Sequence, residues 1–348
     1  TEKSRRTDSR LMLQVTLQEP GCFTSQTTAP EPKIGPGEAL VRVHRIGVCG
    51  TDLHAHAGRQ PFFEYPRVLG HELGVEVVDP GDAPNGLKVG DRCSVEPYLN
   101  CGQCIACRRG KPNCCSNLRV MGVHMDGGMG ELLAVPAPKL HPSATLSYDQ
   151  LALVETLGIG AHAVERAEPT AEDFILVIGA GPIGLSVVQF ALITGAKVVV
   201  MDISESRLAF CREQMGVTHT VMAGENASVE LTAIGDGDLP TIVIDATGNP
   251  RSMAGAFDLP ANGGRIVFVG LFQGELAFND PNFHRRELTV CASRNALPET
   301  FTSITSAMEE GRIDTTPWIT HRMALAEVPA RFSEITKDPT LLKCMIEV

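Results

Sequence analysis

Basic residues are in the minority in this 348-residue chain, where 30 Lys and Arg stand against 41 Asp and Glu for a formal net charge of −11 at pH 7. Proteins that bind nucleic acid without sequence preference need an excess of positive charge, because they neutralise phosphates. The sequence therefore predicts no nucleic-acid partner. Aromatic residues are also scarce, at 5% of the chain with a single Trp, which gives little sign of a bulky aromatic binding pocket.

Neither a secretory signal nor a membrane span is indicated. Residues 1–10 have no apolar core, so we expect a flexible surface extension there. Residues 174–196 carry no charge over a length that would suit a bilayer, but glycines and a proline at 179–184 interrupt them early. Residues 174–178 alone have the pattern of a buried strand. We therefore expect a globular protein of the cytoplasm, without a membrane partner.

A cluster of short cysteine spacings lies between residues 101 and 115. It reads Cys101-Gly-Gln-Cys104-Ile-Ala-Cys107 and ends in the adjacent Cys114 and Cys115. Four thiolates complete a tetrahedral zinc shell and leave no open position, so such a zinc would be structural. A disulfide cluster or unrelated buried thiols are the alternatives, and the short spacings in a polar stretch favour the metal. Spacing alone leaves the fourth ligand open between Cys114 and Cys115.

The sequence changes in character near residue 172, and its length predicts about two domains. Before that point, glycine, proline and short apolar runs such as 39–43 and 74–78 predict a β-rich domain. After it, strand patterns alternate with helix patterns, which predicts an α/β fold with a doubly wound parallel sheet. The strands are expected at 174–178, 198–201, 241–245 and 265–269, and the helices at 182–194, 205–215 and 251–258, with one more at 299–310.

A glycine fingerprint follows the strand expected at 174–178. The motif is Gly179-Ala-Gly181-Pro182-Ile183-Gly184. The first glycine permits a tight turn, the second lets the backbone approach a pyrophosphate, and the third lets the helix pack on the strand. The start of that helix would offer free N–H groups to the phosphates. A glycine turn without a cofactor is the alternative.

Asp202 strengthens the dinucleotide interpretation, because it ends the next apolar strand. A carboxylate there can accept hydrogen bonds from the ribose hydroxyls and would repel a 2′-phosphate, so NAD is favoured over NADP. Arg207 opposes that preference, since a nearby Arg can accommodate the phosphate. A helix-capping role for Asp202 is the alternative.

Two further glycine-marked turns hold residues that can bind a metal. The first contains Cys49, Thr51 and His54, and the second contains His71 and Glu72. A thiolate, an imidazole and a carboxylate are the three protein ligands that an open, catalytic zinc site keeps. Alone, such residues are more often structural than ligating.

Together these segments resemble the zinc-dependent medium-chain alcohol dehydrogenase family. The likeness extends from about residue 11 to the end of the chain, and it is strongest to the polyol (sorbitol) dehydrogenase branch. Residues 293–296 and 316–321 resemble bacterial dehydrogenases for sugar acids of the galactonate type. The family implies a GroES-like catalytic domain at 1–158 and 295–348, with a structural zinc lobe at about 93–118, and a Rossmann NAD-binding domain at 159–294.

The resemblance also implies roles for individual residues. Cys49, His71 and Glu72 match the catalytic zinc ligands, with Glu72 bound directly or through a water, and Glu155 matches a second carboxylate used in the same way. Thr51 and His54 match a relay that carries the substrate's proton to solvent, and Cys115 matches the fourth ligand of the structural zinc. Which glutamate binds at rest stays open.

These roles predict a zinc- and NAD-dependent oxidoreductase with two zinc ions per chain. Its substrate would be a secondary alcohol of a polyol or sugar acid, and Arg294 would grip that substrate or the cofactor. A threonine-type amino-alcohol or general secondary alcohol dehydrogenase is the nearest alternative, and a non-catalytic nucleotide-binding protein is an alternative of another class. The family suggests a homodimer or homotetramer, with residues 265–271 as an apolar edge strand at the contact.

Overall fold

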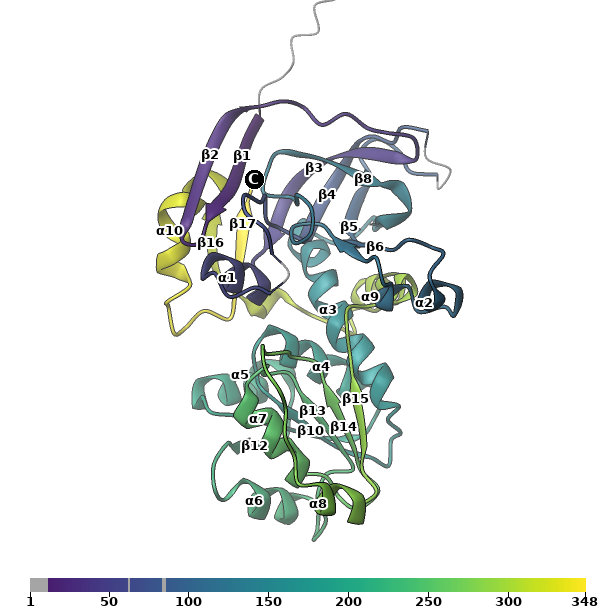
Figure 1. Ribbon diagram of the computed structural model, residues 1–348, viewed down its shortest axis with the longest axis vertical. Coiled ribbons are helices and arrows are strands. Elements are labelled where there is room, and N and C mark those ends of the chain that lie inside the picture. The colour runs from purple at the N-terminus through teal and green to yellow at the C-terminus, as the bar shows by residue number, and fades with distance from the viewer. Residues whose placement is uncertain (1–11, 62, 83–85) are drawn as a thin grey trace, which may run out of the picture. The chain divides into compact units, whose positions relative to one another are not determined.

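The computed structural model describes residues 12–61, 63–82 and 86–348, and Figure 1 shows its ribbon. The chain divides into two compact units, residues 1–155 with 305–348 and residues 156–304. The divisions fall inside two helices, α3 (Tyr148–Ala167) and α9 (Pro298–Glu309). The boundaries expected from sequence fall inside α3 and just before α9. The surface extension expected at 1–10 lies outside the described residues.

The first unit is built on a seven-stranded sheet in the order β16-β17-β3-β4-β5-β9, with β8 also paired to β3. β16 and β17 are parallel, and the other pairs are antiparallel. This arrangement confirms the β-rich fold expected for the first part of the chain. The strands are β3 (Glu38–Gly47), β4 (Glu72–Asp79), β5 (Arg92–Val95), β8 (Leu132–Pro136), β9 (Leu140–Pro142), β16 (Ile319–Ala324) and β17 (Lys343–Glu347).

Alternation of apolar and other residues explains how the central strands pack. In β4, the fully buried Val75 and Val77 flank the half-buried Glu76, and β3 buries Val41 and Val43 around Arg42. Successive side chains of a strand point to opposite faces, so each strand presents one apolar row to the core. Each buried valine contributes about 1.5–3 kcal/mol of transfer free energy.

Smaller elements complete the first unit. Two short sheets pair β1 (Met12–Glu19) with β2 (Cys22–Ala29), and β6 (Tyr98–Leu99) with β7 (Arg119–Val120). The helices wholly within the unit are α1 (Gly50–His56), α2 (Ile105–Arg108) and α10 (Val328–Ile335), and short 3₁₀ turns lie at Pro112–Cys114, Ala137–Lys139, Thr316–Trp318 and Leu325–Glu327.

The second unit contains a six-stranded parallel sheet in the order β12-β11-β10-β13-β14-β15. β10 lies inside this sheet and all five of its residues are buried, as the continuous apolar run requires. The doubly wound parallel sheet is thereby confirmed. The strands are β10 (Phe174–Ile178), β11 (Lys197–Asp202), β12 (His219–Met222), β13 (Ile242–Asp245), β14 (Arg265–Phe268) and β15 (Thr289–Ala292), and the helices are α4 (Pro182–Ile193), α5 (Glu205–Met215), α6 (Ala227–Ile234), α7 (Pro250–Gly255), extended by a 3₁₀ turn at Ala256–Asp258, and α8 (Asp280–Arg285).

The edge of this sheet differs from the expectation. Residues 265–271 were expected to form an edge strand, but β14 lies between β13 and β15 and is paired on both sides. The edge on this side of the sheet is β15, whose Thr289 and Val290 are exposed. Because β15 lacks a continuous apolar run, the pattern of buried parallel strands does not reveal it.

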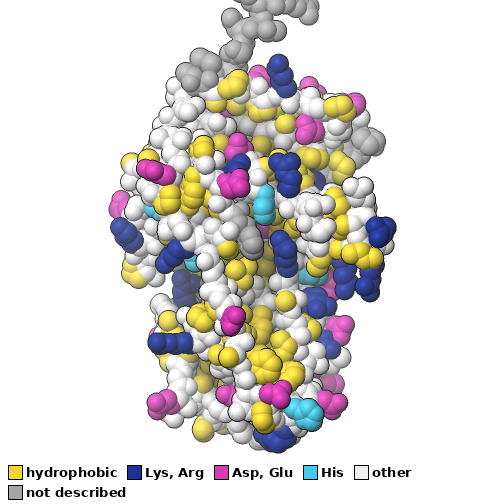
Figure 2. Space-filling view, viewed as in Figure 1, with side chains coloured by type: hydrophobic (Ala, Val, Ile, Leu, Met, Phe, Trp, Pro, Cys, Tyr) yellow, Lys and Arg dark blue, Asp and Glu magenta, His cyan; other side chains and the backbone are white. Residues whose placement is uncertain are grey.

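The long uncharged stretch at 174–196 is shared between β10 and α4, with the glycine turn between them. Among the described residues, no helix has the length and apolar character needed to cross a membrane. Acidic and basic side chains are interspersed over the face shown in Figure 2.

Candidate catalytic and cofactor sites

Antiparallel pairing of β3 with β4 brings the catalytic zinc ligands expected from sequence together. Gly47, at the end of β3, pairs with Glu72, at the start of β4. Cys49 follows two residues after Gly47, as the N-cap of α1, and His71 immediately precedes Glu72. The ligand atoms of Cys49, His71 and Glu72 consequently lie within 4.8 Å of one another.

Gly47 leaves the space that the Glu72 side chain needs. A Cβ atom at position 47 would lie 2.0 Å from Glu72 Oε2. Any other residue there would displace the carboxylate, so the glycine before Cys49 is a steric requirement of this site.

Asp52 is bonded to the backbone of Cys49 and lies next to His71. Its Oδ2 accepts a hydrogen bond of 2.9 Å from the backbone N–H of Cys49, and its Oδ1 lies 3.8 Å from His71 Nδ1. Burial raises the pKa of Asp52, while His71 and the Cys49 N–H act in the opposite direction. Burial lowers the pKa of His71, but Cys49 and Asp52 outweigh it and leave that pKa well above its usual value.

The chemistry of this donor set fits a zinc ion. Asp52 Oδ1 and His71 Nδ1 are buried and have no hydrogen-bond partner among the described residues. Buried polar atoms without partners are rare in folded proteins. A sulfur, an imidazole and a carboxylate grouped together, with a second carboxylate behind the imidazole, match zinc and its usual outer partners.

Glu155 lies outside the three-residue group, on α3, and is buried. Its Oε1 accepts a hydrogen bond from the hydroxyl of Tyr98, a buried residue of β6. Burial raises the pKa of Glu155, and Glu72 adds to that effect, whereas His71 opposes it. Glu155 therefore shares the electrostatic environment of the metal-binding group without belonging to it in this structure.

Lys343 is a site residue that the sequence reasoning missed. It begins β17, is 2% exposed, and its Nζ lies 2.6 Å from Glu72 Oε1 and 3.1 Å from the carbonyl oxygen of Val48. The available signal was a lysine at the start of the apolar run Cys344–Ile346. A buried lysine requires an anionic partner.

The two relay residues expected from sequence lie on α1. Thr51 is half-buried and His54 is exposed. Residues three apart on a helix are neighbours on its surface, so these two side chains share one side of α1. Burial and the nearby Arg59 lower the pKa of His54.

The four cysteines expected to bind the structural zinc form a second group. The sulfur atoms of Cys101, Cys104, Cys107 and Cys115 lie within 4.8 Å of one another, and the exposed Cys114 is not part of the group. None of the eleven cysteines forms a disulfide. The group fits the donor set and number that a closed zinc site requires.

Backbone N–H groups point at these sulfur atoms. The N–H groups of Cys101 and Asn117 donate to Cys115 Sγ at 3.2 and 3.3 Å. Backbone hydrogen bonds from Cys107 and Ser116 lower the pKa of Cys104 to about 5. Hydrogen bonds of this kind favour the thiolate, which is the form that binds metal. In Cys115 the Cys101 N–H has the same effect, but burial and the neighbouring thiols outweigh it and raise the pKa to about 11.

The glycine fingerprint forms the turn between β10 and α4. Gly179 has a φ of +97°, which favours glycine, and a Cβ at Gly184 would lie 1.6 Å from the carbonyl oxygen of Gly179. Gly181 is the N-cap of α4 without a side-chain cap, and Pro182 and Ile183 open the helix. The first turn of α4 can therefore present its N–H groups to a phosphate.

Asp202 and Arg207 both form hydrogen bonds with the backbone of this turn. Asp202 Oδ2 accepts a hydrogen bond from the N–H of Ala180 at 2.6 Å, and Arg207 donates to the carbonyl oxygen of Ala180 at 3.2 Å. The structure thus brings together the residues expected to read the ribose. Arg294 is exposed in the loop between β15 and α9, and its role stays a prediction.

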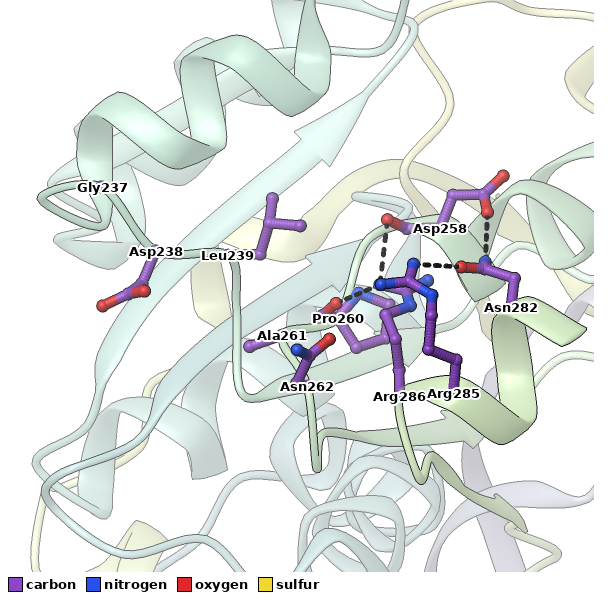
Figure 3. A pocket seen from close by; sticks show the side chains of 10 residues that line it. All are labelled: Gly237, Asp238, Leu239, Asp258, Pro260, Ala261, Asn262, Asn282, Arg285 and Arg286. Atoms are coloured by element: carbon purple, nitrogen blue, oxygen red, sulfur yellow. Dashed lines mark hydrogen bonds between the residues drawn. The ribbon is translucent and has the colours of Figure 1, made fainter.

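A cavity of about 570 Å³ in the second unit contains none of the expected site residues. Figure 3 shows its lining, in which the Arg286 guanidinium donates to the carbonyl oxygens of Asp258 and Pro260. The cavity lies among the segments that precede β13, β14 and β15, which include part of α8, at the amino ends of these parallel strands. Ligands of open parallel sheets bind at the carboxyl ends, so this cavity is not the candidate cofactor site.

The fold and both metal-binding groups define a zinc-type dehydrogenase, and comparison with known families agrees. Residues 35–145 match the alcohol dehydrogenase GroES-like domain, and residues 182–310 match the zinc-binding dehydrogenase domain. The chain belongs to the zinc-binding alcohol dehydrogenase family and is an oxidoreductase of that class. The family resemblance drawn from the sequence motifs is thereby confirmed.

Two individual relatives match most of the length of the chain. L-galactonate-5-dehydrogenase of Escherichia coli K12 is 42% identical over 90% of this chain and 93% of its own. L-threonine 3-dehydrogenase of Pyrococcus horikoshii is 30% identical over 90% of this chain and 92% of its own.

Two solved structures share the fold across nearly the whole chain. An alcohol dehydrogenase from Escherichia coli CFT073, complexed with NADH, has a TM-score of 0.90 at 30% identity and covers 97% of this chain and 100% of its own. A zinc-binding dehydrogenase from Sinorhizobium meliloti, bound to NADP, has a TM-score of 0.89 at 29% identity and covers 97% of this chain and 99% of its own.

Proposed function

We propose that the protein oxidises a secondary alcohol of a polyol or sugar acid and passes the hydride to NAD, with two zinc ions per chain. The observation that carries the proposal is the group of Cys49, His71 and Glu72 within 4.8 Å, next to α1 with Thr51 and His54. A zinc ion in this group supplies a Lewis acid that makes an alcohol easier to deprotonate.

The residues of the chain divide the remaining tasks. The hydroxyl of Thr51 would relay the substrate's proton, accepting it while giving up its own toward His54. His54 would release the proton to solvent, since it is exposed and on the same side of α1. Asp52 holds the Cys49 backbone by a hydrogen bond, and its carboxylate lies 3.8 Å from His71, where it favours the imidazole electrostatically. Cys101, Cys104, Cys107 and Cys115 hold the second zinc and with it their loop.

NAD is the expected cofactor because Asp202 stands at the turn where the adenosine ribose binds in such folds. The carboxylate accepts hydrogen bonds from ribose hydroxyls and repels a 2′-phosphate. Arg207, bonded to the same turn, keeps NADP as a weaker alternative. Arg294 is assigned to the substrate or the cofactor on the sequence alone.

The proposed substrate class rests on the 42% identity to L-galactonate-5-dehydrogenase, which is a sugar-acid dehydrogenase. A threonine-type amino alcohol is the second candidate, favoured by the similarity to the Pyrococcus threonine dehydrogenase. A binding-only role is disfavoured, because the expected ligand and relay residues are all present in the chain.

We further propose a cytoplasmic homodimer or homotetramer that assembles through β15. On the side away from β14, this edge strand has no neighbouring strand among the described residues, and its Val290 is 40% exposed. An unprotected edge of this kind pairs readily with a second copy. Light scattering on the purified protein measures the number of chains in the assembly.

Formation of NADH across a panel of polyols, aldonates and amino alcohols tests the activity, with NAD and NADP compared on protein of known zinc content. We expect turnover of one sugar-acid or polyol class. Cys49→Ala should abolish turnover and keep NAD binding, because Cys49 and the glycine turn belong to different units. Cys22→Ala, at an exposed cysteine, is the control and should behave like the parent. Loss of NAD binding in Cys49→Ala would contradict this division of tasks.

A further inference from the structure

We propose that Tyr98 couples the four-cysteine group to the catalytic site. The segment between β6 and β7, residues 100–118, is called the cysteine loop. This loop holds Tyr98 in place, and the Tyr98 hydroxyl orients Glu155. Tyr98 acts through Glu155 and is therefore a positioning residue. The inference rests on the proposed function, which gives Glu155 a part in catalysis, and it goes further by making activity depend on the structural zinc.

The hydroxyl of Tyr98 donates a hydrogen bond to Glu155 Oε1 between two buried side chains. Tyr98 is 3% exposed and Glu155 is 4% exposed. A hydrogen bond to a carboxylate is roughly twice as strong as one between neutral groups, and buried groups cannot turn to bulk water for a replacement partner. The Tyr98 hydroxyl therefore fixes the direction in which this carboxylate oxygen points.

Glu155 lies close enough to the metal-binding group for its orientation to matter there. Burial is the main cause of the raised pKa of Glu155, and the charge of Glu72 adds to it while the charge of His71 opposes it. Charges shift a pKa in this way mainly at short range. Without the bond from Tyr98, the carboxylate beside His71 is free to turn.

Tyr98 stands at the base of the cysteine loop. β6 and β7 close the loop there, where Tyr98 pairs with Val120. The N–H of Met121 also donates to the carbonyl oxygen of Pro97 at 3.0 Å. Cys101 follows three residues after Tyr98. The position of the Tyr98 ring thus depends on how firmly this short ladder is held.

The cysteine group is the feature that orders the loop. Within residues 100–118 only Asn113, Cys115 and Leu118 are buried, and α2 buries none of its residues. The N–H of Cys101 donates to Cys115 Sγ at 3.2 Å, so the two sides of the loop meet at the thiolates. A two-stranded ladder is at best marginally stable alone, and a structural metal supplies folding energy. An empty cysteine group should therefore loosen the ladder and Tyr98 with it.

Tyrosine spectroscopy tests this coupling without requiring turnover. The chain has three tyrosines, so carbon-13 at the ring carbon that bears the hydroxyl gives few signals, and Tyr98→Phe identifies one of them. Glu155→Gln should shift the Tyr98 signal, and so should Cys101→Ser, which releases zinc from the loop. The Tyr148 signal should stay in place, since its ring stacks on His44 outside the loop. A Tyr98 signal that Cys101→Ser leaves unmoved contradicts the coupling.

Kinetics separate positioning from stability. Tyr98→Phe should lower kcat by roughly 10- to 100-fold and leave KM for NAD unchanged, because the glycine turn belongs to the other unit. Tyr148→Phe, which removes a hydroxyl from the helix that carries Glu155, is the matched control and should behave like the parent. Cys101→Ser should lower kcat in the parent but cause little further loss in Tyr98→Phe, measured below the unfolding temperatures. Losses that multiply would mean that the loop acts by another route.

The reverse direction provides a test if Cys101→Ser does not fold. Coupling between two sites is reciprocal, so the bond between Tyr98 and Glu155 must also stabilise zinc in the loop. In Cys49→Ala, whose remaining zinc is in the loop, adding Tyr98→Phe should weaken zinc retention against a chelator by roughly 5-fold or more. Adding Tyr148→Phe should not. Unchanged retention with Tyr98→Phe would overturn the coupling.

Cys49→Ala also separates the two levels of inference. If this variant keeps two zinc ions per chain, or if the parent turns over none of the proposed substrates, the proposed function fails. The tyrosine signals then still report whether the cysteine loop holds Tyr98 against Glu155. If the parent is active and Cys49→Ala loses one zinc, a failure of the Tyr98 tests removes only the coupling.

Discussion

Asp202 accepts a hydrogen bond of 2.6 Å from the backbone N–H of Ala180, which joins the end of β11 to the glycine turn after β10. The other carboxylate oxygen accepts a bond of 2.8 Å from the N–H of Ser204, the N-cap of α5. Two backbone donors therefore hold the carboxylate in one orientation. In the proposed cofactor site, a carboxylate fixed in this way would discriminate among ribose groups without having to be reoriented.

Replacement of Asp202 by Ala should shift the cofactor preference toward NADP. The variant loses charge-assisted hydrogen bonds to the ribose, each of about 1.5–3 kcal/mol, which corresponds to roughly 10- to 100-fold in kcat/KM with NAD. It also loses the repulsion of a 2′-phosphate, while Arg207 remains at the turn. The measurement is kcat/KM with each cofactor, with Glu213→Ala on the exposed side of α5 as the control. An unchanged ratio of NAD to NADP would disprove the role of Asp202.

The four-cysteine group predicts different effects of substituting Cys101, which belongs to it, and Cys114, which does not. Cys101→Ser should release one zinc and lower the unfolding temperature, because the loop from Cys101 to Cys115 depends on the metal. Cys114→Ser should do neither, since Cys114 is exposed and outside the group. Metal analysis and thermal unfolding of both variants check this. If Cys114→Ser releases zinc and Cys115→Ser does not, the fourth ligand is misassigned.

The protonation of His54 should determine the pH below which the rate of alcohol oxidation falls. Its pKa is lowered from 6.5 by burial and by Arg59, and it accepts a proton only when neutral, above its pKa. The rate of alcohol oxidation should therefore stay high below pH 6.5 and fall only as the pH drops through the lowered pKa. His54→Gln should lose up to roughly 100-fold in kcat/KM and also this acid limb.

His56 provides the comparison on the same helix. Its ring stacks on Phe23 at 5.6 Å between centroids and so faces the core. His56→Gln should keep the acid limb of the pH profile even where stability decreases. An acid limb that survives in His54→Gln means that another group titrates there.

Local patterns made much of the fold predictable from the sequence. The buried run at 174–178, the glycine turn and Asp202 lie within one βαβ unit, where period and turn chemistry specify the structure. β12 and β15 were missed because they are short and partly exposed, with residues such as Thr289 and Val290. Their place in the sheet comes from pairing with β11 and β14, which no local pattern encodes.

The same distinction between local sequence patterns and contacts made only by the fold explains which residues of the candidate site could be predicted. Cys49 and the pair His71–Glu72 lie in recognisable turns, and the resemblance linked them. Lys343 and Tyr98 contact Glu72 and Glu155 only through the fold, across 271 and 57 residues of sequence. Neither belongs to a motif with a fixed spacing, so only the three-dimensional structure places them beside the carboxylates.

The ion pairs of Asp149 predict how the free energy of unfolding depends on pH. It lies at the start of α3 and accepts hydrogen bonds from Arg45 of β3 at 2.9 Å and from Arg322 of β16 at 2.6 Å. Burial raises the pKa of Asp149, but Arg322 and Arg45 outweigh it and hold the pKa below 3.8. Because the folded-state pKa is depressed, this stabilisation is present above the unfolded-state pKa and is lost as the pH falls through the folded-state pKa.

Asp149→Asn should therefore lower the free energy of unfolding by about 1 kcal/mol at neutral pH, because these pairs are partly exposed and screened. The difference from the parent should shrink below about pH 4, where the unfolded-state carboxyl becomes protonated, and vanish at lower pH. Urea unfolding midpoints of both proteins at each pH measure it, and the comparison cancels effects common to both, such as zinc release. Asp236→Asn, in the exposed pair with Lys197, should match the parent throughout. A difference for Asp149→Asn that persists undiminished at low pH would mean that the asparagine perturbs packing rather than removing a charge.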